Sequence, residues 1–202
     1  MTDSFDVRAA RWDENTERVE RARRDADAIA QALGRGGLRT MELGCGTGTT
    51  ALALKNVWSE IVLCDSSAGM LTMAREKIQA AGLEGVSYFQ SDLVEGPLPE
   101  GPFDLVYATM MLHHVKDPVA LFRRLAPLFA PGGQLIVIDL DSEDGSFHAE
   151  SIVPHNGFTR EELERTVGAA GMTIHSWQSC ASFRRAEREY TRFLMIAVPV
   201  VS

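Results

Sequence analysis

Apolar positions recur along the chain with two different periods. In "NTERVERARRDADAIAQAL", Val19, Ala22, Ala26, Ile29 and Leu33 follow one another at steps of three and four residues, with charged side chains between them. This spacing predicts an amphipathic helix, which the glycines of "GRGG" close. Further along, short continuous apolar runs alternate with helical patterns, so the chain is expected to switch repeatedly between strand and helix.

The apolar runs predict a sheet covered on both faces. Runs such as "LIVI" lack the alternation of apolar and polar residues that is typical of a sheet with one solvent-exposed face. An α/β class, with a doubly wound and mostly parallel sheet, follows. Thr159 and Glu162 have the spacing of a capping box, which starts the last predicted helix. Strands are expected at 38–43, 60–65, 86–90, 103–110, 134–140, 172–178 and 190–198, with helices reaching 57 and over 68–81, 118–133 and 159–171.

Composition narrows the functions. At 202 residues and 45% apolar content, one domain is expected over 1–202, with 1–36 as an N-terminal segment and helix and 37–202 as the core. A net charge of -8 disfavours nucleic acid as a partner, and the absence of an apolar leader or long apolar run predicts a soluble, cytoplasmic protein without membrane contact. Cys45, Cys64 and Cys180 form no C-x-x-C pair, so no zinc site or disulfide framework is predicted.

The stretch "MELGCGTGTTAL" joins a predicted strand to a predicted helix through a glycine loop. Glycines let backbone N–H groups approach a ligand closely at such a junction. Gly44, Gly46 and Gly48 run G-x-G-x-G, and Thr49 stands where the dinucleotide fingerprint has its third glycine. The lysine of a triphosphate-binding loop is also missing. The loop therefore predicts a nucleotide-type ligand of another kind, or else a tight turn without a ligand.

Acidic residues follow the first three predicted strands. Asp65 lies 21 residues after Gly44, close to the spacing of an acid that binds ribose hydroxyls, although it could equally cap the helix from Ala68. Asp92 ends the third strand, where a loop or capping role is the alternative, and Glu42 precedes the glycine loop. So many carboxylates disfavour a phosphate, so a nucleoside with a neutral or cationic tail is favoured.

With these motifs in order, the chain resembles the class I S-adenosylmethionine (SAM)-dependent methyltransferases, particularly the small bacterial group related to methyltransferase domain 11. The segments that carry the resemblance are "MELGCGTGTTAL", "LCDSSAGML", "FQSDLVE", "FDLVYATMMLHHVKDP" and "LAPLFAPGGQLIVID". It implies a Rossmann-like, seven-stranded sheet of order 3-2-1-4-5-7-6 with an antiparallel last strand. It also implies SAM-binding roles for Glu42, Gly44, Cys45, Gly46 and Gly48 at the methionine part, Asp65 and Ser66 at the ribose, Met70, Asp92 and Leu93 at the adenine, and Thr109 beside the sulfonium.

The N-terminal "FDVRAARWDEN" resembles the segment "FD-x-x-A-x-x-(W/Y)-D" that folds over the SAM pocket in this family. By that resemblance Trp12 would cap the cofactor. The alternative is that Trp12 only anchors the first helix to the core, because an aromatic body under a loop serves either purpose.

Methyl transfer needs alignment above all, and a base only where the acceptor must lose a proton. His148 and His155 lie in a loop without core periodicity, which makes them the candidates for a base, whereas His113 and His114 are expected to be structural. His175 lies in a predicted strand, where a packing role is expected. A metal site of His148 and His155 with Asp141, Glu143 or Asp144 matches no spacing motif, so none is predicted.

The sequence thus predicts methyl transfer from SAM to an oxygen, nitrogen or carbon atom of a small-molecule acceptor, with S-adenosylhomocysteine (SAH) as product. The identity of the acceptor stays open, as does the choice between a monomer and a homodimer. Two alternatives remain: a SAM-binding sensor or scaffold without transferase activity, and a nicotinamide-dependent oxidoreductase on the same sheet.

Overall fold

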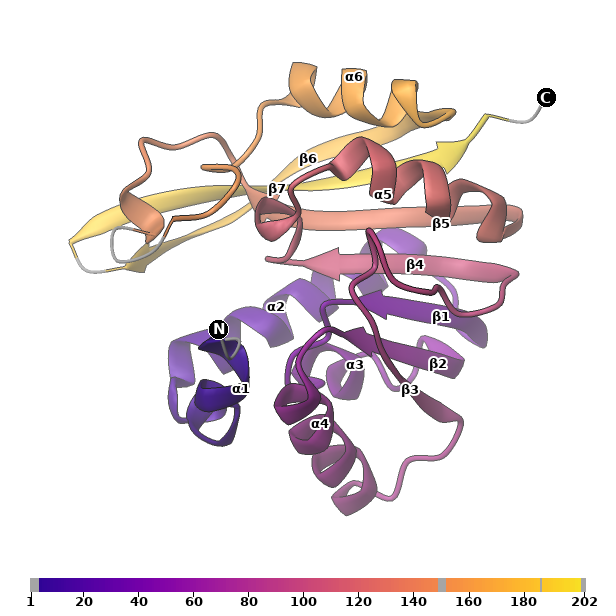
Figure 1. Cartoon of the computed structure of the whole chain (residues 1–202), viewed down its shortest axis with the longest axis vertical. Helices are drawn as coiled ribbons and strands as arrows, with labels where there is room; N and C mark the ends of the chain where they lie inside the picture. The colour runs from indigo at the N-terminus through magenta and orange to yellow at the C-terminus, as the bar shows by residue number, and fades with distance from the viewer. Residues whose placement is uncertain (1–3, 149–151, 186, 201–202) are drawn as a thin grey trace.

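The computed structural model describes residues 4–148, 152–185 and 187–200. Its strands form one seven-stranded sheet of order β3-β2-β1-β4-β5-β7-β6, in which β7 runs antiparallel to all the other strands. Figure 1 shows the strands side by side in this order. The strands are β1 (Leu38–Leu43), β2 (Trp58–Asp65), β3 (Val86–Gln90), β4 (Phe103–Thr109), β5 (Phe129–Leu140), β6 (Met172–Arg185) and β7 (Arg188–Pro199).

The helices begin at polar caps that the sequence supplies. Asn15, Ser67, Asp117 and Thr159 each accept a backbone N–H of the first turn, and Thr159 completes the expected capping box with Glu162. The α-helices are α1 (Ser4–Arg8), α2 (Thr16–Leu33), α3 (Thr49–Ala53), α4 (Ala68–Ala80), α5 (Pro118–Leu125) and α6 (Arg160–Ala169). The 3-10 turns are η1 (Ala9–Glu14), η2 (Leu112–His114), η3 (Ala126–Leu128) and η4 (Ser146–His148).

Helices cover both faces of the sheet, as the continuous apolar runs predicted. On β4, Leu105 and Tyr107 pack with residues of α2, α3 and α4, whereas Val106 and Ala108 pack with residues of α5 and α6. Successive strand residues therefore enter opposite cores, so both positions of each pair are apolar. The expected α/β class, strand order and antiparallel last strand are confirmed.

Two predicted helices are shorter than their sequence patterns. The helix expected over 118–133 ends at Leu125, because Pro127 offers no N–H, and the following apolar residues join β5, where Phe129 pairs with Phe103. The helix expected to reach 57 ends at Ala53. In the first case, pairing within the sheet recruits residues that local periodicity assigned to a helix, whereas residues 54–57 form a turn that leads into β2.

The last two strands are longer than predicted. They form a hairpin that includes most of "RRAERE", a stretch between the two predicted strands. Figure 1 shows this hairpin extending beyond the ends of the other strands. At its tip, Arg185 donates to the backbone oxygen of Phe147 and Arg188 pairs with Asp144. The hairpin thereby contacts the loop after β5. None of the described helices is long and apolar enough to cross a membrane.

Candidate active site

The glycine loop turns sharply between β1 and α3. Gly44, Gly46 and Gly48 all have positive φ (63°, 52° and 72°), a conformation that residues with a Cβ rarely adopt. Space is also limiting, since a Cβ on Gly48 would lie 3.2 Å from the Cβ of Ala74 in α4, and one on Gly44 would lie 2.3 Å from Cγ of Met111. Both conformation and packing therefore require glycine here.

Asp65 lies at the carboxyl end of β2, against this loop. Its Oδ2 accepts the N–H of Gly46 at 2.8 Å and its Oδ1 accepts the N–H of Ser67 at 2.9 Å. The N-cap of α4 is Ser67, so the capping alternative for Asp65 is wrong. The carboxylate instead joins the glycine loop to the start of α4, where a nucleoside at the sheet edge would meet it.

Glu42 lies in β1 just before the glycine loop and is only 2% exposed. Its Oε2 accepts the hydroxyl of Tyr107 at 3.0 Å, and burial raises the pKa of Glu42 to about 8. Nearby Cys45 and Cys64 are buried as well, and burial raises the pKa of the Cys64 thiol to about 12. These thiols therefore stay protonated at neutral pH, which makes them apolar packing groups.

The remaining predicted contacts of the nucleoside surround the same edge. Asp92 is exposed, and its Oδ1 accepts the N–H groups of Val94 and Glu95, which is the local turn role given above as its alternative. Leu93 and Met70 are buried, Thr109 is half-buried and Ser66 is exposed.

The N-terminal segment is tied to this edge by its two aspartates. Oδ1 of Asp6 accepts the hydroxyl of Ser67 at 2.5 Å and the N–H of Gly69 at 2.8 Å. Asp13 accepts the hydroxyl of Thr47 at 2.8 Å and pairs with Lys77 at 2.6 Å. Trp12 is the conspicuous residue of this sequence motif, but Asp6 and Asp13 make the hydrogen bonds that fix the segment.

Aromatic rings fill the space beneath this segment. The Phe5 ring lies 5.7 Å from that of Trp12 and 5.5 Å from that of His114. Nε1 of Trp12 would be 4.0 Å from a Cβ on Gly46, so the indole lies beside the glycine loop. Both expected roles of Trp12, as a lid and as an anchor, are compatible with this position. Figure 1 shows α1 near the carboxyl ends of β1 and β2.

Strand β4 ends in an unusual backbone conformation. Met110 has a φ of 53°, which is uncommon for a residue with an unbranched side chain and rare outside functional turns, and its N–H is bonded to the oxygen of Ile138. The turn directs Met111 over Gly44 and leads into η2. The chain therefore bends sharply at the point where the methyl donor and acceptor are expected to meet.

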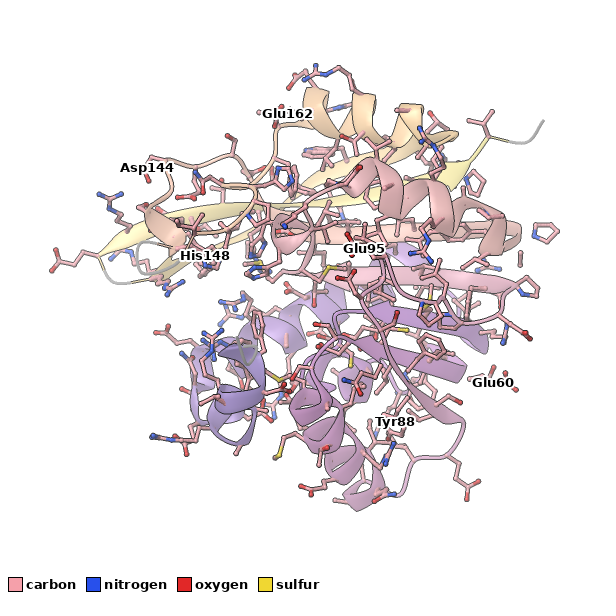
Figure 2. All side chains as sticks on the ribbon, in the orientation of Figure 1. Glu60, Tyr88, Glu95, Asp144, His148 and Glu162 are labelled. Carbon is pink, nitrogen blue, oxygen red and sulfur yellow. The ribbon has the colours of Figure 1, made fainter. Side chains whose placement is uncertain are left out.

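Three histidines converge beyond this turn. Ring centroids lie 4.2 Å apart for His113 and His114, 5.0 Å for His113 and His148, and 5.2 Å for His114 and His148. Burial lowers the pKa of His114 to about 3 and that of His148 to about 4, with the neighbouring His113 adding to both shifts. Figure 2 shows His148 on the loop after β5, to which Asp144 also belongs.

His113 has a carboxylate partner that the sequence did not reveal. Its Nδ1 lies 2.6 Å from Oδ1 of Asp139, a fully buried residue near the end of β5. Asp139 also accepts the backbone N–H groups of His113 and Leu140. Burial alone would raise the pKa of Asp139, but the interaction with His113 and the hydrogen bonds from these backbone groups lower it. An acid inside the apolar run "LIVIDL" was the available signal.

The other two histidines lie apart from this cluster. His155 donates its backbone N–H to the oxygen of His113, and its ring lies 4.9 Å from that of Phe158. His175 is exposed on β6, so the packing role expected for it is wrong. The reason is that β6 is an edge strand of the sheet, whose outer positions face solvent.

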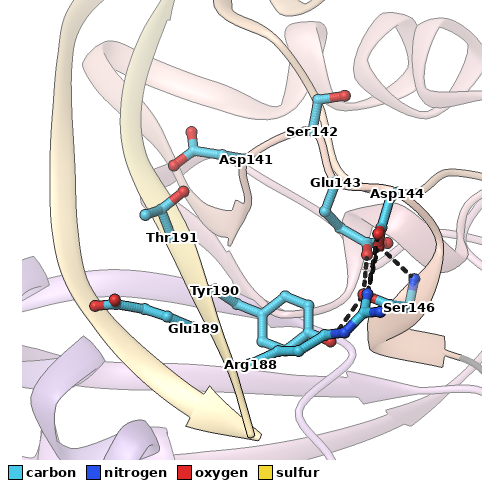
Figure 3. A pocket seen from close by; sticks show the side chains of 9 residues that line it. All are labelled: Asp141, Ser142, Glu143, Asp144, Ser146, Arg188, Glu189, Tyr190 and Thr191. Atoms are coloured by element: carbon cyan, nitrogen blue, oxygen red, sulfur yellow. Dashed lines mark hydrogen bonds and ion pairs between the residues drawn. The ribbon is translucent and has the colours of Figure 1, made fainter.

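A hollow of about 380 Å³ lies between the loop after β5 and the start of β7. Figure 3 shows Arg188 reaching across it to Asp144, and the hydroxyls of Ser146 and Tyr190 lie 2.9 Å apart. The acidic lining residues are accompanied by one arginine; the lining consists of Asp141, Ser142, Glu143, Asp144, Ser146, Arg188, Glu189, Tyr190 and Thr191.

Solved structures share this fold. The methyltransferase in a complex with the Trm112 methyltransferase activator of Haloferax volcanii superposes with a TM-score of 0.79 at 19% identity, covering 98% of this chain and 99% of that one. A complex of DhpI with SAH superposes with a TM-score of 0.70 at 21% identity, covering 96% and 93%. The sheet, the glycine loop and the acidic residues Glu42, Asp65 and Asp92 near the strand ends together define the class I methyltransferase fold.

Sequence comparison gives a matching family model. Residues 41–137 match the model of the methyltransferase domain family, which confirms the resemblance seen in the motifs. The demethylmenaquinone methyltransferase of Thermus thermophilus is 35% identical over 114 residues, which are 55% of this chain and 51% of that protein. The chain spans about half the length of the curated relatives it matches.

Proposed function

We propose that this protein transfers a methyl group from SAM to a small-molecule acceptor and releases SAH. The observation that carries the proposal is the glycine loop with Asp65 at its edge, beneath an N-terminal segment that hydrogen bonds attach to both the loop and α4. The match of residues 41–137 to the model of the methyltransferase domain family supports SAM as the cofactor.

The residues of the loop fit this cofactor. Gly44, Gly46 and Gly48 adopt conformations that residues with a Cβ rarely adopt, and neighbouring atoms also crowd a side chain at Gly44 and Gly48, as a cradle for the methionine part requires. We assign Asp65 to the ribose hydroxyls, and the exposed Asp92 with the buried Leu93 to the adenine. Glu42 supports the loop from below, so we assign it a positioning role in place of direct contact.

Methyl transfer from a sulfonium is an in-line displacement with an activated leaving group. The acceptor atom forms a bond to the methyl carbon as the carbon–sulfur bond breaks, and the sulfur keeps the electron pair. The protein mainly aligns the two reactants, a contribution of up to about 7–11 kcal/mol in favourable cases. A rigid loop under a fixed N-terminal segment is suited to this task.

For the acceptor we propose a ring that ionises at a phenolic oxygen and is methylated at carbon or oxygen. The support is the name of the relative from Thermus thermophilus, which acts on demethylmenaquinone. Such an acceptor loses a proton, and His148 and His155 remain the candidates to receive it. Each has an Nε2 that is buried and without a hydrogen-bond partner among the described residues.

The test is the release of SAH from SAM with a panel of acceptors that includes reduced naphthoquinones and simple phenols. Turnover with a phenolic acceptor supports the proposal. Tight SAH binding without turnover on any acceptor would favour a sensor or scaffold, and stabilisation by NAD but not by SAH would favour an oxidoreductase. A ligand at 100 times its Kd adds about 2.7 kcal/mol to the free energy of unfolding, so thermal shifts separate these outcomes.

A further inference from the structure

Three imidazoles from two separate loops converge at the carboxyl ends of β4 and β5. His113 and His114 belong to η2, and His148 to η4, 34 residues further along the chain. One ring nitrogen of each lies within 4.8 Å of those of the other two. We propose that these residues, the three-histidine cluster, bind one divalent transition-metal ion, a site that the spacing in the sequence did not predict.

The first support is the hydrogen bond that orients His113. A carboxylate only accepts, so Nδ1 of His113 carries the proton that it shares with Asp139 at 2.6 Å, and Nε2 is left with a lone pair. Histidines that bind metals characteristically donate their other ring N–H to a carboxylate or carbonyl in this way. Asp139 itself is fixed by two backbone N–H groups.

The second support is an unpaired ring nitrogen of His148. Its Nε2 is buried and has no hydrogen-bond partner among the described residues, so a nitrogen that could bind an ion lies within the cluster. Neutral imidazoles suit zinc, copper, cobalt and nickel better than magnesium or calcium.

Metal binding would require the three histidine rings to move slightly closer together. Metal–nitrogen bonds of about 2.0–2.1 Å in a tetrahedral site place the nitrogens about 3.4 Å apart, so the rings would approach by up to about 1.4 Å. Further aromatic rings lie next to the cluster: the ring centroid of Phe147 is 4.7 Å from that of His148, and the ring centroid of Phe5 is 5.5 Å from that of His114. Three protein ligands leave a fourth position for water or an anionic oxygen. The proposal goes beyond the proposed methyl transfer, because metal binding does not require SAM. With the ion bound, His155 alone remains as the candidate base.

The experiment is a titration of chelator-treated protein with Zn²⁺ and Co²⁺ in the absence of SAM, read by a competing metal indicator and by the visible spectrum of bound Co²⁺. We expect one ion per chain and an intense, tetrahedral type of Co²⁺ spectrum. His148→Gln and His114→Gln should each lower the affinity at least about 100-fold. Asp139→Asn should lower it about 10- to 100-fold, as loss of an orienting partner does.

His175→Gln is the matched control, because His175 is an exposed histidine outside the cluster, and its affinity should equal that of the unchanged protein. Circular dichroism and SAH binding show which variants fold. No uptake of metal, equal uptake by His148→Gln, or a weak octahedral type of Co²⁺ spectrum in the unchanged protein would each overturn the site. The last result needs no variant and would place the ion on carboxylates. Failure to turn over an acceptor would leave all of these readouts intact.

Discussion

Asp65 is the residue on which the nucleoside site depends most directly. Its two carboxylate oxygens accept backbone N–H groups from the glycine loop and from the start of α4. Since hydrogen bonds to a charged group contribute about 1.5–3 kcal/mol, a ribose bound to this carboxylate would gain considerable affinity.

We predict that Asp65→Asn weakens SAH binding about 10- to 100-fold, because the amide keeps the shape of the side chain but loses the charge and one acceptor. Isothermal titration calorimetry measures the change. Asp27→Asn, at an exposed position of α2, is the control and should bind like the unchanged protein. Equal affinities of the two variants would remove Asp65 from the cofactor site.

Glu42 makes stability depend on pH. Burial raises its pKa from 4.5 to about 8, so between these values the folded protein holds a proton that the unfolded chain has lost. The stabilisation from this group is therefore complete below about pH 4.5 and decreases as the pH rises to about 8, by at most about 1.4 kcal/mol per pH unit.

The corresponding prediction concerns Glu42→Gln, which retains an acceptor for the hydroxyl of Tyr107 and cannot ionise. Relative to the unchanged protein, the variant should become more stable as the pH is raised from 6 to 8. Urea unfolding at the two pH values gives this difference. A difference that stays constant, or reverses in sign, would show that Glu42 is ionised in the folded protein.

At the scale of elements, the N-terminal segment functions as a unit fixed at two points. Asp6 binds the start of α4, and Asp13 bridges Thr47 of the glycine loop and Lys77 of α4. The segment therefore restrains both sides of the proposed cofactor site, which explains why "FDVRAARWDEN" has an acid at each end.

Asp13→Asn should accelerate the dissociation of SAH by about tenfold, because it removes the ion pair with Lys77 and loosens the segment over the loop. Stopped-flow measurement of tryptophan fluorescence, to which Trp12 beside the glycine loop contributes, follows the dissociation. Glu14→Gln alters the neighbouring acid, whose partner is the exposed Arg11, and should leave the rate unchanged. A similar rate in both variants would mean that the segment does not retain the cofactor.

Periodicity and caps predicted most elements, because they depend on neighbours in the chain. The capping box at Thr159 and the end of α2 at Gly34 are local features and were found. The end of α5 and the length of the last hairpin depend on pairing across the sheet, which local patterns do not report. For the same reason the glycine loop was found from sequence, whereas the bonds of Asp139 to His113 and of Asp13 to Lys77 were not.

At the scale of the whole molecule, a buried ion pair joins the first long helix to the last strand. Asp25 of α2 accepts two bonds from Nη1 of Arg192 in β7, at 2.5 and 2.7 Å, and both side chains are almost completely buried. These residues are 167 positions apart, so the pair links the two ends of the chain across the sheet.

Asp25→Asn should destabilise the fold by about 3–5 kcal/mol, because it leaves the charge of Arg192 buried without a counter-charge. The double variant Asp25→Leu with Arg192→Met should recover most of this loss, since apolar side chains of similar size replace both charges. Urea unfolding of the single and double variants gives the two values. A single variant as stable as the unchanged protein would mean that the pair contributes nothing.

We propose that the edge of this sheet binds SAM and promotes transfer of its methyl group. The most direct measurement follows tritium from methyl-labelled SAM into an extractable product, with reduced naphthoquinones and phenols as acceptors and Asp65→Asn as the control. We predict labelled product from the unchanged protein and at least about tenfold less from Asp65→Asn at subsaturating SAM. Absence of labelled product from every acceptor, in a protein that binds SAH tightly, would contradict methyl transfer.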